Sequence, residues 1–314
     1  MHRKKARRAQ AETPPKAKIV RSASVTVADV ALSHPDKVLF AEQDLTKLDL
    51  AAYYEQIAPW MLPHVAGRPI SLVRCPAGEG KACFFQRHAG KGRAKGIRDI
   101  KVAGKGDGKA FITIDDVQGL ISLVQMGVLE IHVWGCRADK PALPDRIVFD
   151  FDPHQDVPWA RIKGAALEMR ERLRDIKLES FLKTTGGKGL HVVVPIDRKP
   201  TWATAKNFAR AMALLMADDT PALYTTNSRK AERTGRIFID YLRNDQTASA
   251  VAPYSTRARK GAPIAVALAW DELKKLRSPN SFSVASVLAR RKRLKADPWK
   301  AIENLRQTLP MLAG

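Results

Sequence analysis

The chain has 314 residues, enough for one large domain or two small ones with a substantial core. An apolar content of 45%, with no long uninterrupted apolar stretch, excludes a disordered chain and predicts neither a membrane span nor a signal peptide, so we expect a cytoplasmic protein. Lysine and arginine total 54 against 32 acidic residues, and this net charge of +22 favours a polyanionic partner, with nucleic acid ahead of a membrane.

The first 22 residues are basic, poor in apolar side chains and interrupted by Pro14 and Pro15. This composition predicts a disordered arm or a linker, with order beginning near Val25. Further along, Cys75, Cys83 and Cys136 form no CxxC pair. We expect them to be buried or incidental thiols in a reducing compartment, neither a zinc site nor a disulfide framework.

Strands and helices are mixed along the chain without strict alternation, which predicts an α+β or mixed-sheet domain rather than a doubly wound one. Residues 87–109 are rich in glycine and lysine and predict an exposed, mobile basic loop, and the last 45 residues are expected to be helical. The predicted helices cover residues 47–62, 116–126, 158–176 and 202–216. The predicted strands cover residues 70–74, 111–114, 129–134, 146–152, 180–183, 190–196 and 236–242.

Two aspartates, Asp150 and Asp152, are separated by one residue inside an apolar run. Because side chains alternate along a strand, both carboxylates point to one face while Phe149 and Phe151 point to the other. Two like charges side by side repel unless a cation lies between them, and a divalent metal ion meets that need. The alternative is a strand end that runs into an Asp-x-Asp-Pro turn.

A glycine loop, Thr185–Gly189, leads into an apolar strand that begins near His191. Glycines allow backbone N–H groups to approach an anion, to which Thr185 adds a hydroxyl and Lys188 a positive charge. The spacing differs from a Walker A loop, and a hairpin-type turn with a surface lysine is the alternative.

A further carboxylate, Asp240, interrupts the apolar run 237–242. A charge on a buried strand needs a partner, either a bound cation or a neighbouring Arg236 or Arg243. Three strand-borne carboxylates, a phosphate-type loop and a basic surface together supply the parts of two-metal phosphoryl or nucleotidyl transfer.

At this point the chain resembles a known family, the primase-type polymerase domain of bacterial multifunctional DNA ligase D, within the archaeo-eukaryotic primase superfamily. The resemblance covers about residues 32–270. It rests on six motifs in order: SHPDKVLF (33–40), CFFQR (83–87), DRIVFDFDP (145–153), TGGKGLH (185–191), FIDYL (238–242) and APYSTR (252–257). It implies a primase-polymerase fold, with mixed or antiparallel central sheets flanked by helices. One domain would span residues 23–314, with a catalytic core over about 32–270 and a helical part over about 270–310.

The resemblance also assigns roles to residues. Asp150, Asp152 and Asp240 are implied as catalytic metal ligands for Mn²⁺ or Mg²⁺ in a two-metal site. The implied nucleotide-binding residues are Thr185, Gly187, Lys188, His191, Arg257 and Phe85. Thr185 stands where the family usually has serine. Phe84 or Phe85 would stack on a base, and core packing is the simpler interpretation of that pair from sequence.

A second implied pocket binds the 5′-phosphate of the downstream DNA strand through Lys37 and Lys47. His34 stands there where relatives can carry asparagine. The alternative interpretation of the two lysines is a solvated helix entry.

The implied activity is metal-dependent, template-directed addition of nucleotides, preferably ribonucleotides, to primer 3′ ends at gaps or breaks in non-homologous end joining. The implied partners are DNA, nucleoside triphosphates, a bacterial Ku protein, and ligase and phosphoesterase domains, in the cytoplasm at the nucleoid. Two other hypotheses are a catalytically silent nucleic-acid-binding scaffold and an adenylating DNA ligase. The ligase hypothesis rests on the KxDG pattern at Lys105, which arises easily in a lysine- and glycine-rich loop.

Overall fold

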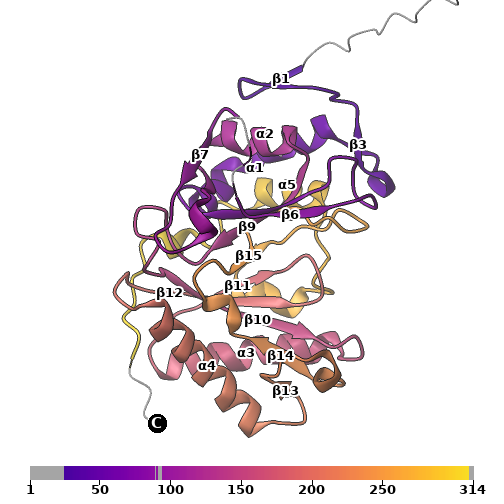
Figure 1. Ribbon diagram of the computed structural model, residues 1–314. Helices are drawn as coiled ribbons and strands as arrows, with labels where there is room; N and C mark the ends of the chain where they lie inside the picture. The colour runs from indigo at the N-terminus through magenta and orange to yellow at the C-terminus, as the bar shows by residue number, and fades with distance from the viewer. Residues whose placement is uncertain (1–24, 89, 91–93, 311–314) are drawn as a thin grey trace, which may run out of the picture.

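The computed structural model describes residues 25–88, 90 and 94–310. The predicted basic arm lies outside these residues. The described part of the chain starts with two small hairpins, and two larger sheets form the body of the molecule (Figure 1). The hairpins pair β1 (Val25–Val27) with β2 (Val30–Leu32) and β3 (Val38–Phe40) with β4 (Leu45–Thr46).

The upper sheet in Figure 1 has the order β15-β9-β5-β8-β7, with β6 also paired to β5. Its pairings are antiparallel. Its strands are β5 (Ile70–Arg74), β6 (Phe84–Gln86), β7 (Ile97–Ile100), β8 (Phe111–Ile114), β9 (Val128–Trp134) and β15 (Ser249–Val251).

The lower sheet has the order β13-β14-β10-β12-β11-β16. Only β13 and β14 run parallel, so the sheet is mixed, as the resemblance implied. Its strands are β10 (Arg146–Pro153), β11 (Phe181–Thr184), β12 (Leu190–Pro195), β13 (Tyr224–Thr225), β14 (Ile237–Asp240) and β16 (Ala267–Leu268). β15 follows β14 in the chain but pairs with β9, so the chain passes from the lower sheet to the upper sheet. It then returns to the lower sheet with β16.

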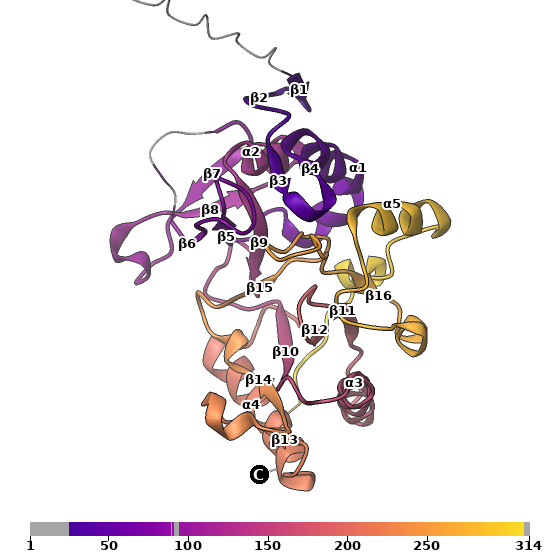
Figure 2. The same ribbon diagram turned by 90° about the vertical axis from the view of Figure 1, so that its right-hand side faces the viewer.

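Helices cover both sheets and complete the predicted α+β fold (Figure 2). α1 (Lys47–Val65) and α2 (Val117–Gln125) pack against each other, and α2 lies on β9. α3 (Trp159–Asp175) and α4 (Trp202–Asp219) pack on β10 of the lower sheet, and α5 (Val284–Arg293) contacts α1. None of the helices in the described part of the chain is long and apolar enough to cross a bilayer.

The helix starts follow from their capping residues. The Thr46 hydroxyl accepts a hydrogen bond from Asp49 N at 3.2 Å, and the Asp49 carboxylate accepts one from Thr46 N at 2.9 Å, which forms a capping box before α1. Thr201 accepts a hydrogen bond from Thr204 N at 3.1 Å and so caps α4, as its position in the sequence predicted.

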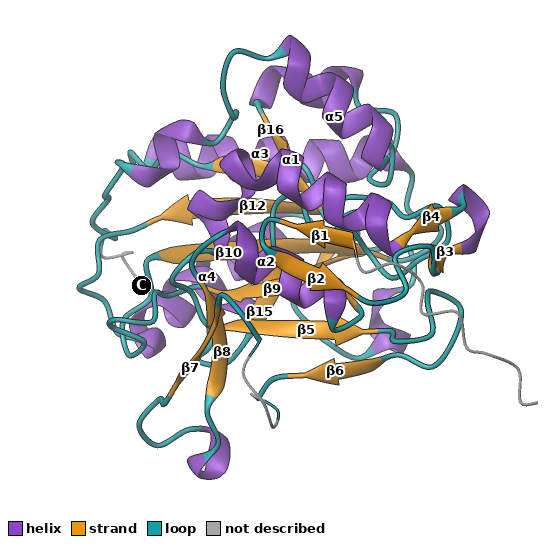
Figure 3. Cartoon of the chain, turned by 90° about the horizontal axis from the view of Figure 1, so that it is seen from above, coloured by secondary structure: helices purple, strands orange, loops and turns teal. Residues whose placement is uncertain are grey.

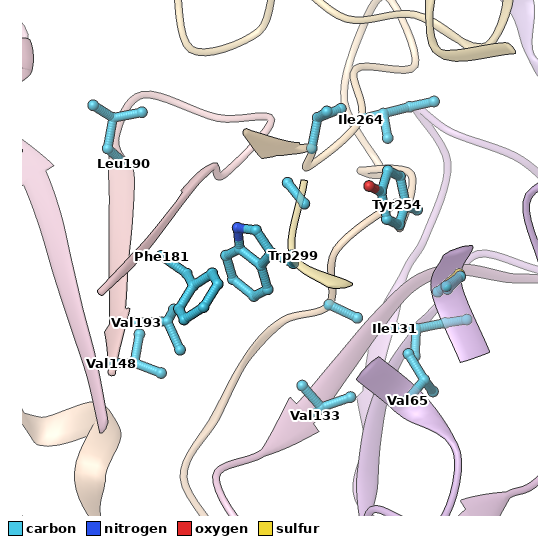
Figure 4. Packing of buried hydrophobic residues seen from close by; sticks show 14 of the residues in the cluster. Val65, Ile131, Val133, Val148, Phe181, Leu190, Val193, Tyr254, Ile264 and Trp299 are labelled. Carbon is cyan, nitrogen blue, oxygen red and sulfur yellow. The ribbon is translucent and has the colours of Figure 1, made fainter. Parts of the chain in front are cut away.

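One continuous hydrophobic core joins the two sheets. In Figure 4, Val133 from the upper sheet and Phe181 and Val193 from the lower sheet lie around Trp299. The Trp299 indole donates a hydrogen bond to Leu182 O at 2.8 Å, so the C-terminal segment is fixed against the lower sheet.

Two sequence predictions need correction. The last 45 residues are only partly helical, with α5 and short 3-10 helices at Trp270–Lys275 and Lys300–Glu303, because prolines such as Pro279 and Pro298 interrupt the run. Within residues 87–109, of which 89 and 91–93 are not described, Ile97–Ile100 forms a strand instead of a loop, since it pairs with Phe111–Ile114. Figure 3 shows this β7–β8 hairpin extending from the sheet.

The prediction of unpaired thiols is wrong for two of the three cysteines. Cys75 and Cys83 form a disulfide across a sequence separation of 8, and Cys136 is free and buried. The reason is strand pairing that sequence spacing did not reveal. Arg74 lies opposite Phe84 in the antiparallel β5–β6 pair, so the two cysteines are the next facing positions.

The disulfide is expected to stabilise the chain by closing the short loop between β5 and β6. Reduction, or the Cys83→Ser variant, should lower the free energy of unfolding by about 2–3 kcal/mol in the chain-entropy description. Urea unfolding with and without a reductant measures this difference, and the Cys83→Ser variant should not respond to the reductant. Equal stability of the natural chain in both conditions would contradict the expectation.

Candidate active site

The row of acidic residues is formed by antiparallel pairing in the lower sheet. Asp150 on β10 lies directly opposite Asp240 on β14 and, on its other side, opposite His191 on β12. Facing positions on neighbouring strands bring Cβ atoms to about 4.5–5.5 Å. The structure therefore brings together two of the three predicted carboxylates with His191 in one row across three strands.

An arginine bridges the first pair of carboxylates. Arg243 lies in the short 3-10 helix that follows β14. Its Nε is 3.3 Å from Asp150 Oδ2 and 3.2 Å from Asp240 Oδ2. On the far side, His191 Nε2 lies 3.3 Å from Asp150 Oδ1. The pairing of Asp240 with Arg243, considered from sequence as an alternative to metal binding, is present.

Asp152 has a different environment from Asp150. Its Oδ2 accepts a hydrogen bond from Arg233 Nη1 at 2.9 Å, and its side chain is 48% exposed. The Arg233 guanidinium lies 3.9 Å from the centroid of the Phe238 ring, a cation–π contact that holds it beside the strand. Asp152 is thus the most accessible carboxylate of the three.

The surrounding charges separate the proton affinities of the three carboxyl groups. Burial alone would raise the pKa of Asp150, but a hydrogen bond from His191 and the positive charges of Arg243 and Lys183 hold that pKa well below its usual range. Burial, followed by the charge of Asp150, raises the pKa of Asp152. Burial also raises the pKa of Asp240, and Arg243 opposes that rise. Asp150 therefore ionises first, and a bound cation would favour ionisation of all three.

The donor set suits a hard divalent cation, because carboxylate oxygens are the ligands that Mg²⁺ and Mn²⁺ prefer. Among the described residues, no group of three His, Cys, Asp or Glu side chains is already gathered around one point. Instead Arg243 supplies the positive charge between Asp150 and Asp240. Asp150, Asp152 and Asp240 would hold such an ion, which would supply positive charge where Arg243 now supplies it.

The glycine loop is held together by Thr185. Its hydroxyl accepts hydrogen bonds from Gly187 N at 3.2 Å and Gly189 N at 3.3 Å, and donates one to Gly189 O at 3.0 Å. Glycine is required at position 186, where φ is +63° and a Cβ would lie 2.9 Å from Arg257 Cγ. The hydroxyl predicted to bind phosphate thus also shapes the loop.

A cavity of about 220 Å³ lies between the glycine loop and the acidic row. Its lining brings together seven of the predicted residues: Asp150, Asp152, Thr185, Gly187, Lys188, His191 and Arg257. Asp240 does not line the cavity itself, but its ion-pair partner Arg243 does. Burial holds the pKa of His191 down at about 4, so its imidazole is neutral and faces Asp150.

Sequence reasoning missed two lining residues, His132 and Arg259, and it considered Arg243 only as a partner of Asp240. A signal for His132 was present: Glu130 and His132 alternate with apolar residues in β9, the same pattern that singled out Asp150 and Asp152. Arg259 carried no comparable signal, because it lies in an irregular segment of the chain.

The two phenylalanines of β6 are on the surface. Phe84 and Phe85 are each 47% exposed, so the core interpretation is wrong. Phe85 makes an edge contact with His132, with 6.0 Å between ring centroids, which places it near the cavity wall. Its stacking on a base stays a prediction.

The residues of the predicted 5′-phosphate pocket lie together at the start of α1, next to β3 and β4 (Figure 2). Lys47 N donates to Lys37 O at 2.8 Å, and Lys37 N donates to His34 O at 3.1 Å. Lys47 is 6% exposed, and its ammonium donates to Ser33 O at 2.7 Å. Burial and the charge of Lys37 lower the pKa of Lys47. The helix-entry interpretation is thus correct for position, but Lys47 is not solvated.

Carboxylates beside a cavity lined by a glycine loop, a lysine and arginines suit the transfer of a phosphate-bearing group, and the fold and site together define a nucleotidyltransferase. The family described as "LigD, primase-polymerase domain" matches residues 46–299. The chain belongs to this family.

The similar proteins agree with this assignment. The multifunctional non-homologous end joining protein LigD of Pseudomonas aeruginosa is 36% identical over 302 residues, which cover 94% of this chain and 36% of that protein. The bifunctional non-homologous end joining protein LigD of Bacillus subtilis is 25% identical over 278 residues, which cover 88% of this chain and 45% of that protein. The chain thus spans less than half the length of these two relatives.

A solved structure is also similar. It is the polymerase domain of Mycobacterium tuberculosis ligase D in complex with DNA, with 32% identity and a TM-score of 0.82, and the match covers 87% of this chain and 98% of that one. The primase-polymerase fold predicted from the motifs is therefore confirmed.

Proposed function

We propose that this chain adds nucleotides, preferably ribonucleotides, to primer 3′ ends at gaps or double-strand breaks during non-homologous end joining. The proposal extends to DNA and nucleoside triphosphates as ligands, and to Ku protein and ligase and phosphoesterase domains as partners. The observation that carries it is the row of Asp240, Asp150 and His191 beside a cationic cavity. A cavity with this lining suits a triphosphate better than a neutral substrate.

In the proposed reaction, the primer 3′-hydroxyl attacks the α-phosphate, the new phosphodiester forms, and pyrophosphate leaves. Asp150, Asp152 and Asp240 would hold Mn²⁺ or Mg²⁺, which supplies activation of the hydroxyl and neutralisation of phosphate charge. Lys188 and Arg257 bind the triphosphate oxygens from the glycine-loop side of the cavity.

Primer extension on gapped duplexes tests this function directly. The reaction is run with Mn²⁺ or Mg²⁺, with ribo- or deoxyribonucleotides, and with or without a 5′-phosphate at the gap. We expect template-matched addition that is faster with ribonucleotides. DNA binding without incorporation in either metal would instead identify a nucleic-acid-binding scaffold.

The 5′-phosphate pocket gives a selective prediction. Lys37→Ala is expected to weaken binding to 5′-phosphorylated gaps about tenfold, because one charge-assisted contact to phosphate is lost. Binding to the same gap without the phosphate should be unchanged. Lys199→Ala, at a side chain that is 80% exposed, is the control for loss of one surface charge. Equal weakening of both duplexes by Lys37→Ala would remove this assignment.

A further inference from the structure

Behind the cavity wall lies a buried carboxylate that the proposed chemistry does not use. Glu130 on β9 is 5% exposed, yet both of its oxygens have partners. Oε1 accepts a hydrogen bond from Ala258 N at 2.8 Å. Oε2 lies 2.8 Å from His132 Nε2 and 3.0 Å from Arg257 Nε. A carboxylate is costly to bury without such partners, so this arrangement depends on all three.

The contact with Arg257 reaches the phosphate side of the cavity. Arg257 Nη1 donates to Thr185 O at 2.6 Å, while its Nε faces Glu130 as an ion pair. The stem of Arg257 packs against Gly186, where a Cβ would lie 2.9 Å from Cγ. Glu130 and the glycine loop therefore fix the arginine from opposite ends, with its guanidinium at the cavity.

The contact with His132 reaches the other side. Glu130 and His132 are two residues apart on one strand, so their side chains share a face of the sheet. The His132 ring meets the Phe85 ring edge-on, at 6.0 Å between centroids and 82° between planes. The Glu130 carboxylate thus contacts both Arg257, beside the glycine loop, and His132, whose ring packs against the exposed Phe85 of β6.

We propose that Glu130 is a positioning residue of the nucleotide site, which holds Arg257 against the triphosphate and His132 beneath Phe85. This proposal rests on the proposed function, because it assumes that the cavity holds a nucleoside triphosphate. Glu130 does not line the cavity, so it acts through these two side chains and not by contact with the nucleotide. The partner contacts also lower the pKa of Glu130 to about 2, against the effect of burial, so it is ionised at neutral pH.

The test is the Glu130→Gln variant in single-nucleotide gap filling. Glutamine keeps the size of the side chain but loses the charge that pairs with Arg257. We expect the KM for the nucleoside triphosphate to rise about tenfold or more, with a smaller change in kcat. The matched control is Glu272→Gln, which removes another glutamate–arginine pair, 2.6 Å between Oε2 and Arg290 Nη2, outside the site. Its KM should equal that of the natural chain.

A double-mutant cycle distinguishes positioning from a general structural effect. If Glu130 acts largely through Arg257, Glu130→Gln should raise KM much less in the Arg257→Ala background than it does in the natural chain. Fully additive effects, or an unchanged KM in Glu130→Gln, would overturn the proposal. Glu130→Asp keeps the charge on a shorter side chain and should retain more affinity than Glu130→Gln. If neither variant folds by circular dichroism, Glu130 is a folding residue and the proposal also fails.

Nucleotide affinity measured by calorimetry separates this proposal from the proposed function. ATP and Mn²⁺ are titrated into the natural chain and into Glu130→Gln without DNA. A natural chain that binds ATP but incorporates nothing would refute the polymerase function, while a tenfold weaker Kd in the variant would still support the role of Glu130. A natural chain that binds no nucleotide would refute both.

Discussion

Replacement of Asp240 by asparagine is expected to reduce nucleotide addition by about 10³-fold or more. Asparagine keeps the shape of the side chain but removes one of the three negative charges proposed to hold divalent ions, and such ions stabilise the transition state by several kcal/mol. Asp240 faces Asp150 directly across the β10–β14 pair, so the strand pairing itself holds these two carboxylates side by side. DNA binding should persist, because it depends on the basic surface.

The control for this variant is Asp245→Asn. Asp245 follows five residues later and pairs with Lys206 Nζ at 2.6 Å on the surface, with a side chain that is 52% exposed. It should extend primers at the rate of the natural chain. Gap-filling rates and DNA affinities are measured for both variants with Mn²⁺ and with Mg²⁺. Normal extension by Asp240→Asn would exclude the metal assignment.

The strands and helices that were predictable are those with strong local signals. The run that contains Asp150 alternates apolar and acidic residues, and Thr201 marks a helix start, so both were found from the sequence. The C-terminal segment was predicted poorly because its helices are short and its fixed point is Trp299. The position of that side chain depends on packing against Phe181, more than 100 residues earlier.

The site was predictable where chemistry is concentrated in short motifs and was not predictable where it depends on pairing between strands. Asp150, Lys188 and Arg257 stood in motifs, and the structure places all three around one cavity. Glu130 lies in a strand whose neighbours in the fold are distant in sequence, such as Ala258. No local pattern shows that contact, because it arises when the segment after β15 lies against β9.

Lys183 is a buried lysine beside the site that lowers the stability of the fold. This lysine on β11 is 2% exposed, and its ammonium has one side-chain neighbour, His191 Nδ1 at 3.4 Å. Burial and the nearby charge of Arg257 lower its pKa from 10.5 to about 7, although Asp150 favours the charged form. Lys183 therefore lies behind His191 and supplies positive charge to Asp150 at the expense of stability.

Lys183→Met is expected to stabilise the chain by roughly 2–4 kcal/mol at pH 7, because a flexible apolar side chain replaces a poorly paired buried amine. The same variant should add nucleotides about tenfold more slowly, since His191 and Asp150 lose the cation behind them. Urea unfolding and gap filling measure the two effects. Lys199→Met, on the surface, should change neither.

The pH dependence of the stability difference identifies the buried amine as its cause. Between about pH 7 and pH 10.5 the unfolded chain binds a proton on Lys183 that the folded chain does not. Stability from this group therefore rises with pH over that window, and the Met variant lacks the rise. The advantage of Lys183→Met should be greatest at pH 7 and below and should shrink towards pH 10. A constant difference would mean that packing, and not burial of a proton-binding group, separates the two chains.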